Sequence, residues 1–220
     1  MKDSDKEKIL NLLIGKENTK DFESWVFKNS DLESSLGNEL YLELISSNYN
    51  DMCLLHNLKQ IILENFISEE EYYSFKYKSV LQDSGWYPKR RIDVDLSKFE
   101  KTDEMQNAFK IIEEFGGLKL NSTDKFDVRE ITIIDFFETP AYFKNMKEYG
   151  LNINLVCFAW VENSYIDILV DKNYNFYQMD NVVSENLYKY IGPNYEQMLK
   201  DFLFFDYNEN FQKVGNSRKF

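Results

Sequence analysis

The sequence predicts an α+β protein, with an all-helical N-terminal part followed by a region that mixes strands with helices. Two observations lead to this prediction. Before residue 82, apolar residues recur mainly at helical spacing. After it, three β-rich runs at 153–161, 165–170 and 174–179 are separated by turn-forming residues, a pattern typical of a β-meander. Of the 220 residues, 43% are hydrophobic and 16% are aromatic, which is enough to build a core rich in aromatic side chains.

The N-terminal part contains several short amphipathic segments. Apolar residues at 9–13 predict a first helix, which Gly15 would end. Residues 21–27 (DFESWVF) predict a second helix that carries its aromatic residues on one side. The apolar run at 38–47 is short, so it is compatible with either a helix or a strand. Residues 51–65 place their leucines and isoleucines at helical spacing and predict a helix.

The last N-terminal helix has a clear start signal. Ser68 and Glu71 form a capping box, which predicts a helix running to about Gln82, with Gly85 just past its end. The composition changes at this point, so we place a domain boundary there. A chain of this length fits one large domain or two small ones, at roughly 100–200 residues per domain. We therefore expect three parts: a helical region over 1–82, an α+β domain over 83–205 and a polar, loose C-terminal tail over 206–220.

Beyond Gly85 the predicted elements alternate. Thr102 is a suitable N-cap for a helix that ends at Phe115 before Gly116-Gly117, and we expect one of these glycines to be left-handed. Trp86 and Phe115 are expected to be buried structural residues. The other expected elements are strands over 86–94, 118–120 and 128–134, a helix from Thr139-Pro140 to Gly150, the meander, and a helix from Asn194 to Phe204.

The charge balance narrows the classes of partner. The net charge is −12, and it is spread evenly: residues 1–80 carry 9 basic and 15 acidic side chains, and residues 81–220 carry 17 and 23. An acidic surface repels nucleic-acid phosphates and anionic lipid, so we expect neither a nucleic-acid partner nor a membrane partner. It would attract a basic protein, although the charge could also serve solubility alone.

The sequence also indicates a compartment. Its charged N-terminus and the lack of a long apolar run predict neither a signal peptide nor a membrane span. Cys53 and Cys157 lie far apart and give no disulfide framework. We therefore expect a cytoplasmic protein.

Few residues could support catalysis. His56 is the only histidine, and Cys53 one turn before it would need carboxylates to complete a zinc site, so we expect no metal and no cofactor. The glycines form no phosphate-binding motif. The carboxylate pairs, Asp93 with Asp95 and Glu113 with Glu114, could do acid–base work but are also ordinary in an acidic chain. These features predict a protein that is not an enzyme.

Three segments of the second part, taken in order, resemble a known family. Residues 84–90 read Ser-Gly-Trp-Tyr-Pro-Lys-Arg, residues 108–118 end in Phe-Gly-Gly-Leu, and residues 188–192 (Tyr-Lys-Tyr-Ile-Gly) precede a helix. Together they resemble the SUKH superfamily of bacterial immunity proteins, especially its third family. One departure is the stretch 156–160, which lacks the family's usual Pro-x-Gly. The motif residues are Gly85, Trp86, Pro88, Arg90, Phe115, Gly116, Gly117, Leu118 and Gly192.

The resemblance covers about residues 84–204 and implies both a fold and a role. The fold is a central, mainly antiparallel sheet packed against helices. The role is that of a non-catalytic immunity protein of a polymorphic toxin system, which binds and neutralises a cognate toxin in bacterial competition. Such a toxin is often a nuclease or a deaminase, and a nuclease site is basic. The first 80 residues resemble a helical module that precedes various small bacterial immunity-like domains.

Two other function classes remain open at this point. SUKH domains also occur in eukaryotic signalling proteins, so the chain could be a regulatory or scaffold module without a toxin partner. It could also be an enzyme of unrecognised type. A toxin gene immediately upstream would favour the immunity role over the regulatory one.

The meander offers a candidate partner-binding surface with aromatic and acidic residues, the mixture that interfaces with basic proteins favour. The alternative is that the aromatics are core and the acids ordinary solvated positions. If charge-neutralising variants of this surface associate with the toxin at the wild-type rate, the helical first 80 residues become the better candidate. The proposed contact residues are Trp160, Glu162, Tyr165, Asp167, Asp171, Tyr174, Tyr177 and Asp180.

Overall fold

The computed structural model describes residues 1–51, 53–93, 102–122, 130–134, 143–145, 152–162, 165–180, 186–205 and 210–214. Over these residues the chain forms eight helices and eight strands, and the predicted α+β class is confirmed. It divides into two compact units, Met1–Lys78 and Ser79–Phe220. None of the described helices has the length and apolar content needed to cross a bilayer.

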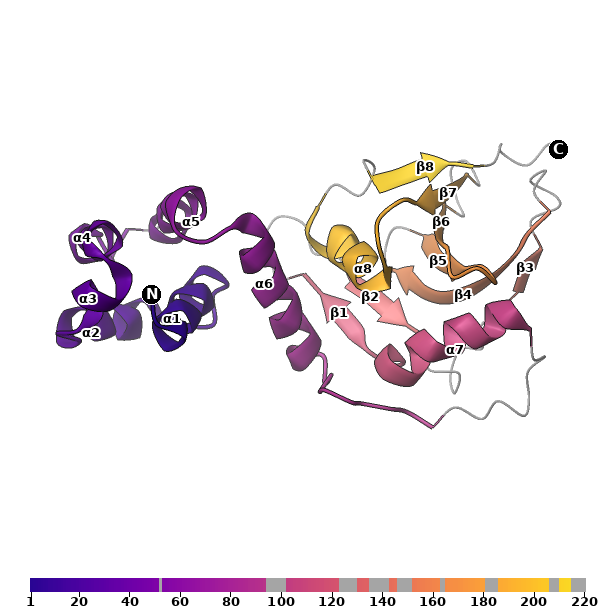
Figure 1. Cartoon of the computed structure of the whole chain (residues 1–220), viewed down its shortest axis with the longest axis horizontal. Helices are drawn as coiled ribbons and strands as arrows, with labels where there is room; N and C mark the ends of the chain where they lie inside the picture. Colours follow the sequence, from indigo (N-terminus) through magenta and orange to yellow (C-terminus); the bar gives the residue numbers. More distant parts are fainter. Residues whose placement is uncertain are drawn as a thin grey trace. The chain divides into compact units, whose positions relative to one another are not determined.

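The first unit is helical (Figure 1). The boundary between the units falls within its last helix. Its helices are α1 (Asp3–Leu13), α2 (Thr19–Lys28), α3 (Leu32–Leu36), α4 (Asn38–Ser46), α5 (Leu54–Asn65) and α6 (Glu69–Asp83). The ambiguous run at 38–47 is α4, because Leu40 and Leu44, one turn apart, both reach the core. The predicted cap of α6 is present, since Ser68 Oγ accepts from Glu71 N at 3.3 Å.

One hydrophobic core holds the first unit together. Fully buried residues come from α1, α2, α4 and α5, and Tyr72 joins them from α6. Around this core, Asn18 caps α2 by accepting from Lys20 N at 2.8 Å. The unit therefore has its own core and its own caps, as an independent domain requires.

The second unit is built on one antiparallel sheet. The strands follow the order β1-β2-β4-β5-β6-β7-β8, and β3 pairs with β4. The predicted meander is β4, β5 and β6, with a register shift between Cys157 and Ala159. The strands are β1 (Lys119–Asn121), β2 (Glu130–Ile133), β3 (Phe143–Asn145), β4 (Asn154–Val161), β5 (Ile166–Val170), β6 (Phe176–Asp180), β7 (Leu187–Tyr190) and β8 (Phe211–Lys213).

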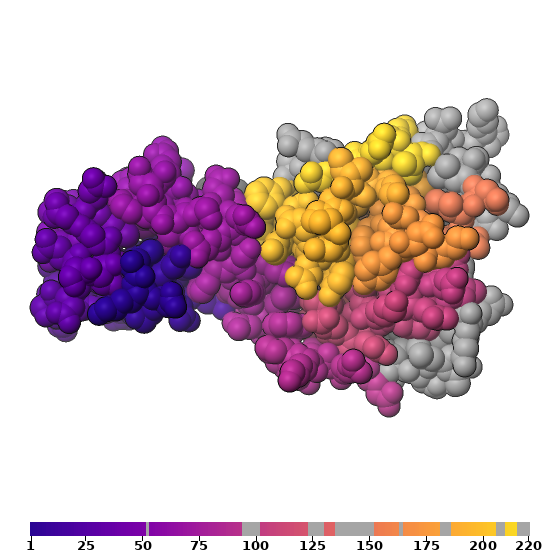
Figure 2. Space-filling model, viewed as in Figure 1, coloured from indigo at the N-terminus to yellow at the C-terminus, as the bar shows by residue number. Residues whose placement is uncertain are grey.

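Two helices pack on one face of this sheet, α7 (Asp103–Phe115) and α8 (Tyr195–Phe204). They contact each other through the rings of Phe115 and Tyr195, whose centroids are 5.4 Å apart. Tyr195 also contacts Phe176 of β6, and Phe202 of α8 contacts Phe211 of β8. In Figure 2, the gold residues of α8 and the crimson residues of α7 are visible on the side of this unit that faces the viewer, next to orange residues of the sheet. The other face of the sheet, which we call the opposite face, points away from both helices.

Both ends of α7 are formed as predicted. Thr102 caps its start by accepting from Met105 N, and Phe115 at its end is 1% exposed. Gly117 is left-handed with φ of 74°, which confirms the predicted helix stop. Gly116 has an ordinary φ but no room for a side chain, because a Cβ there would lie 2.6 Å from the Ile112 carbonyl oxygen.

Three predictions about local structure are wrong. Residues 86–93 form no strand, because their polar groups bond to the end of α7 instead of to a neighbouring strand: Ile92 N donates to Glu113 O at 2.8 Å. The helix expected over 140–150 is contradicted by β3, whose backbone pairs with β4. The other residues of that range lie outside the described residues. The tail expected to be loose contains β8, which pairs with β7.

Candidate functional site

The eight proposed contact residues fall into two separate groups. The first group lies around the turn between β5 and β6 and consists of Asp171, Tyr174 and Tyr177. The second lies at the other end of the meander strands and consists of Trp160, Glu162, Tyr165, Asp167 and Asp180. Of the whole set, Tyr165 is exposed at 68%, three residues are buried, and the other four are half-buried.

The first group builds the β5–β6 turn. The Asp171 side chain is 4% exposed and accepts from Asn173 N, Asn175 N and Asn175 Nδ2 at 2.8–2.9 Å. It also accepts from the Tyr177 hydroxyl at 3.0 Å. Burial, followed by the charge of Asp171, raises the pKa of Tyr177 well above its ordinary value. These contacts give Asp171 and Tyr177 a structural role inside the unit.

Tyr174 belongs to the same turn. It is half-buried and has a left-handed φ of 63°. Its ring contacts Phe176 edge-on, with centroids 5.1 Å apart, and Lys110 Nζ of α7 lies 5.8 Å from its centroid. Burial, with a smaller effect of the Glu114 charge, raises its pKa. Tyr174 therefore helps to hold α7 on the sheet.

The second group contains a different arrangement, centred on Trp160. The Trp160 indole Nε1 donates to Glu162 Oε1 at 2.6 Å, and Thr132 Oγ1 of β2 donates to the same oxygen at 3.0 Å. Both Trp160 and Glu162 are half-buried. We call Thr132, Trp160 and Glu162 the tryptophan–carboxylate cluster. Its donors fix both the ring and the carboxyl group in orientation, which is what a preorganised contact surface needs.

The sheet register places this cluster on the opposite face. Directly paired residues of antiparallel strands point to the same face. The pairs Lys119–Thr132, Thr132–Trp160 and Trp160–Asp167 therefore form a row across β1, β2, β4 and β5. The row continues through buried Met179 and Leu187 on β6 and β7. Along this row Thr132 and Asp167 are buried and Trp160 is half-buried, whereas the Lys119 side chain at the β1 end is 64% exposed.

Tyr165 and Asp180 do not belong to that row. Tyr165 lies in the β4–β5 turn with a left-handed φ of 54°, so strand alternation does not apply to it. Asp180 pairs with Ile166, which is one residue out of step with the row, so it points to the helix-covered face. The predicted set is therefore not one continuous patch.

Most residues of the family motifs lie beside the C-terminal end of α7 or just before the start of α8. Arg90 donates to the carbonyl oxygens of Glu114 and Gly116 at 2.7 and 2.8 Å. The half-buried Trp86 stacks on Phe115 with an interplanar angle of 17°. A Cβ at Gly192 would overlap the phenol of Tyr190. Positive φ at Gly85 follows the end of α6. Leu118 is buried, and Pro88 lies in an exposed turn.

Sequence reasoning missed a further buried carboxylate, on α8. Asp201 of α8 is 3% exposed and accepts from Tyr190 Oη, Gln197 Nε2 and Asn210 Nδ2 at 2.8–2.9 Å. A signal was present in the sequence, because Asp201 lies among the buried apolar residues of α8 at helical spacing. Such a position requires a hydrogen-bonded partner set.

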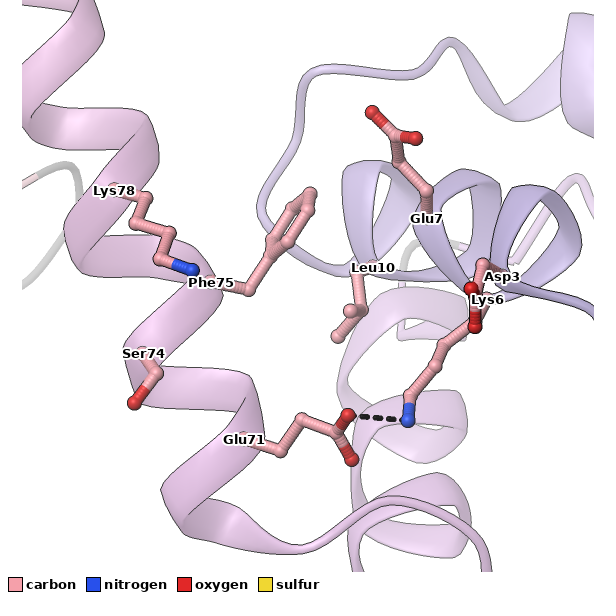
Figure 3. A pocket seen from close by; sticks show the side chains of 8 residues that line it. All are labelled: Asp3, Lys6, Glu7, Leu10, Glu71, Ser74, Phe75 and Lys78. Carbon is pink, nitrogen blue, oxygen red and sulfur yellow. Dashed lines mark ion pairs between the residues drawn. The ribbon is translucent and has the colours of Figure 1, made fainter. Parts of the chain in front are cut away.

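The first unit has a shallow hollow between α1 and α6, of about 280 Å³. Figure 3 shows the apolar side chains of Leu10 and Phe75 between the two helices, and the ion pair of Lys6 with Glu71 beside them. Asp3, Glu7, Ser74 and Lys78 complete the lining. Both signs of charge surround it, so its electrostatics favour no single class of ligand.

His56 lines a second hollow, on α5 and α6. Within the described part of the chain, no three side chains of the His, Cys, Asp and Glu types come together as metal ligands would. His56 and Cys53 are both exposed. The absence of a metal and of a cofactor stays a prediction.

Comparison with known proteins gives one match. A family model described as SUKH-3 immunity protein matches residues 74–204, which is more than half of the chain. The matched range contains α7, the sheet from β1 to β7, and α8. No curated protein and no solved structure shows a significant match.

Proposed function

Since the chain belongs to the SUKH-3 immunity protein family, we propose that it is a non-catalytic immunity protein that binds a cognate bacterial toxin domain and neutralises it in the cytoplasm. The family match over residues 74–204 is the observation that carries this proposal. The toxin would be a protein delivered between competing bacteria, with a nuclease or a deaminase as the expected activity.

The roles of two buried carboxylates, Asp171 and Asp201, support a binding function over a catalytic one. Asp171 and Asp201 each accept several hydrogen bonds from neutral donors that hold the sheet domain together. A general acid or base must instead exchange its proton with a substrate in a cleft. The oxygens of these two carboxylates bond to structural groups of the protein, whereas the carboxylate of a catalyst would have to contact the substrate.

The net negative charge of the chain supports a basic protein as its partner. The net charge of −12 gives a field that attracts a positively charged surface and raises the rate of association. A nuclease holds phosphates in a basic site, so an acidic inhibitor complements it. Part of the acidity lies at the tryptophan–carboxylate cluster, where Glu162 is half-buried. Glu130 on the adjacent strand is also half-buried, and Lys119 Nζ lies 3.9 Å from its Oε1.

The direct experiment starts from the genes immediately upstream of this one and uses the toxin domain encoded by any toxin gene found there. We expect the purified chain to bind that domain, to inhibit its activity in stoichiometric amounts, and to protect cells that express it. Because electrostatic attraction would speed the encounter of the acidic chain with a basic toxin, the association rate should fall steeply as the salt concentration rises. A purified chain that neither binds nor inhibits this domain would contradict the proposal and leave the regulatory or scaffold role as the better account.

The design of charge variants follows from the structure. Neutralising Asp171 would remove the acceptor that holds the β5–β6 turn, so a loss of binding there would report a damaged fold. Glu130→Gln and Glu162→Gln are the better test variants, because each removes one negative charge at a half-buried position. The matched control is Glu33→Gln with Glu39→Gln, which removes two exposed charges from the first unit. If only the control slows association, the helical unit is the docking surface.

A further inference from the structure

The tryptophan–carboxylate cluster has a feature that a solvated acidic position lacks. Glu162 Oε1 is occupied by two donors, Trp160 Nε1 and Thr132 Oγ1. The described residues supply no donor to its other oxygen, Oε2. Within the described part of the chain, the carboxylate is therefore held in place through Oε1 alone, which leaves Oε2 as the oxygen that a partner's donor could reach.

The indole of Trp160 is held equally firmly. Its strand pairs with β2 on one side and β5 on the other, and its N–H is bonded to Glu162. Rotating the ring would break a short hydrogen bond to a charged acceptor, which is stronger than one between neutral groups. The ring is half-buried on the opposite face, so part of its surface is accessible.

Among the residues that the structure describes, the charges next to the cluster are mostly negative. Glu162 N donates to Glu130 O at 2.8 Å, which brings the two acidic residues onto adjacent strands. Lys119 Nζ lies 3.9 Å from Glu130 Oε1, a loose and largely exposed pair. Asp167 is paired with Trp160 in the register. The cluster thus combines an aromatic ring with a carboxylate oxygen that no described residue donates to, and both lie near other acidic residues.

We propose that this cluster is a receptor for an arginine side chain of the toxin partner. A guanidinium group can stack on the indole and donate an N–H to Glu162 Oε2 at the same time. Lysine offers a point charge on a strongly hydrated ammonium, which stacks less well. Arginine and tryptophan are also the residues that most often carry the binding energy of protein interfaces. This proposal deepens the proposed function and rests on it for its biological meaning.

The first test needs no toxin. The chain has 3 tryptophans, so the ¹⁵N–¹H spectrum of the full protein contains a small set of indole signals, and Trp160→Phe identifies the one of interest. We expect Nα-acetyl-arginine amide to shift that signal in a saturable way. The neutral citrulline analogue should not shift it, and the lysine analogue should bind at least fivefold more weakly. Equal shifts with citrulline, or no saturable shift with arginine, would overturn the proposal.

Two variants test whether arginine binding depends on the charge of Glu162. Glu162→Gln keeps an oxygen that can accept from Trp160 Nε1 and Thr132 Oγ1 but removes the charge that a guanidinium requires. It should weaken arginine binding at least fivefold and leave the unfolding midpoint nearly unchanged. Glu196→Gln, an exposed position on α8, is the matched control and should bind arginine as the wild type does. Equal binding by both variants would contradict a role for Glu162.

The second test uses the toxin domain itself. If the wild-type chain binds it, Trp160→Phe and Glu162→Gln should each weaken binding about tenfold, with the larger change in the dissociation rate. Unchanged affinity in both variants would overturn the arginine receptor while the immunity function stands. If the wild type does not bind the toxin, the immunity function fails, and the arginine titration alone decides whether the cluster is a receptor.

Discussion

The Tyr190 hydroxyl donates to Asp201 Oδ2 at 2.8 Å, and this bond joins β7 to α8. Asp201 also accepts from Gln197 within its own helix and from Asn210 just before β8. One buried carboxylate thus fastens α8 to two neighbouring strands near the edge of the sheet. The family motif that ends in Gly192 belongs to the same arrangement, because only glycine leaves room for the Tyr190 phenol.

Replacing Asp201 with alanine should destabilise the second unit by about 2–4 kcal/mol. The substitution leaves the Tyr190 hydroxyl and the amide groups of Gln197 and Asn210 without their acceptor, and an unsatisfied buried polar group costs about 1–3 kcal/mol. Urea unfolding followed by fluorescence would measure the loss. Glu196→Ala, one exposed position on the same helix, is the control and should cost less than 1 kcal/mol. Similar losses in the two variants would contradict this account.

The two glycines after α7 should differ in their tolerance of alanine. Gly117→Ala places a side chain at φ of 74°, which costs about 1–2 kcal/mol. Gly116→Ala should cost more, because its Cβ would lie 2.6 Å from both the Ile112 carbonyl oxygen and Ile92 Cδ1. The backbone oxygen cannot move without disturbing the helix end. Thermal unfolding of both variants gives the order, and a more stable Gly116→Ala variant would show that this contact relaxes easily.

Local patterns made much of the fold predictable. The helices of the first unit follow from apolar residues at i, i+3 and i+4, and the meander follows from strand-forming runs with turns between them. The departures all involve partners that lie far away in the sequence. Arg90 and Ile92 bond to the end of α7, and β3 and β8 exist through pairing with β4 and β7. Periodicity carries no information about such partners.

The candidate site was likewise predictable only in part. Sequence reasoning selected Trp160 and Glu162 together with Asp171 and Tyr177, because all four are aromatic or acidic residues of one meander. It could not show that the Asp171 carboxylate accepts its hydrogen bonds from the β5–β6 turn, whereas Glu162 orients Trp160 through one oxygen and receives no donor from the described residues on the other. That difference depends on hydrogen-bond geometry, which strand alternation does not determine.

Arg90 should not be replaceable by lysine. Its two guanidinium nitrogens donate to the carbonyl oxygens of Glu114 and Gly116, which are groups left without helical partners at the end of α7. A lysine ammonium cannot reproduce this planar pair of donors. We expect Arg90→Lys to cost about 1–2 kcal/mol in unfolding free energy, from the loss of one charge-assisted bond. Arg91→Lys at the adjacent exposed position is the control, and an equal effect there would contradict the prediction.

Alkaline solution should destabilise the protein. Burial, reinforced by Asp201, raises the pKa of Tyr190 above its ordinary value, and burial with the Asp171 charge does the same for Tyr177. In the first unit, burial and the Glu23 charge raise the pKa of Tyr49 to about 12. An unfolded tyrosine loses its proton near pH 10. Above that pH the unfolded chain therefore binds fewer protons than the folded one, and stability falls as the pH rises.

The tyrosine contributions should accordingly be complete below about pH 10 and lost progressively above it, through about pH 12 for Tyr49. Free energies of unfolding measured from pH 8 upward would show this slope. Tyr190→Phe should lower stability at pH 8, because its hydrogen bond to Asp201 is gone, yet flatten the slope above pH 10. Tyr165→Phe, at a side chain that is 68% exposed, should leave the slope unchanged. If both variants keep the wild-type slope, the buried Tyr190 hydroxyl is not a source of the alkaline sensitivity.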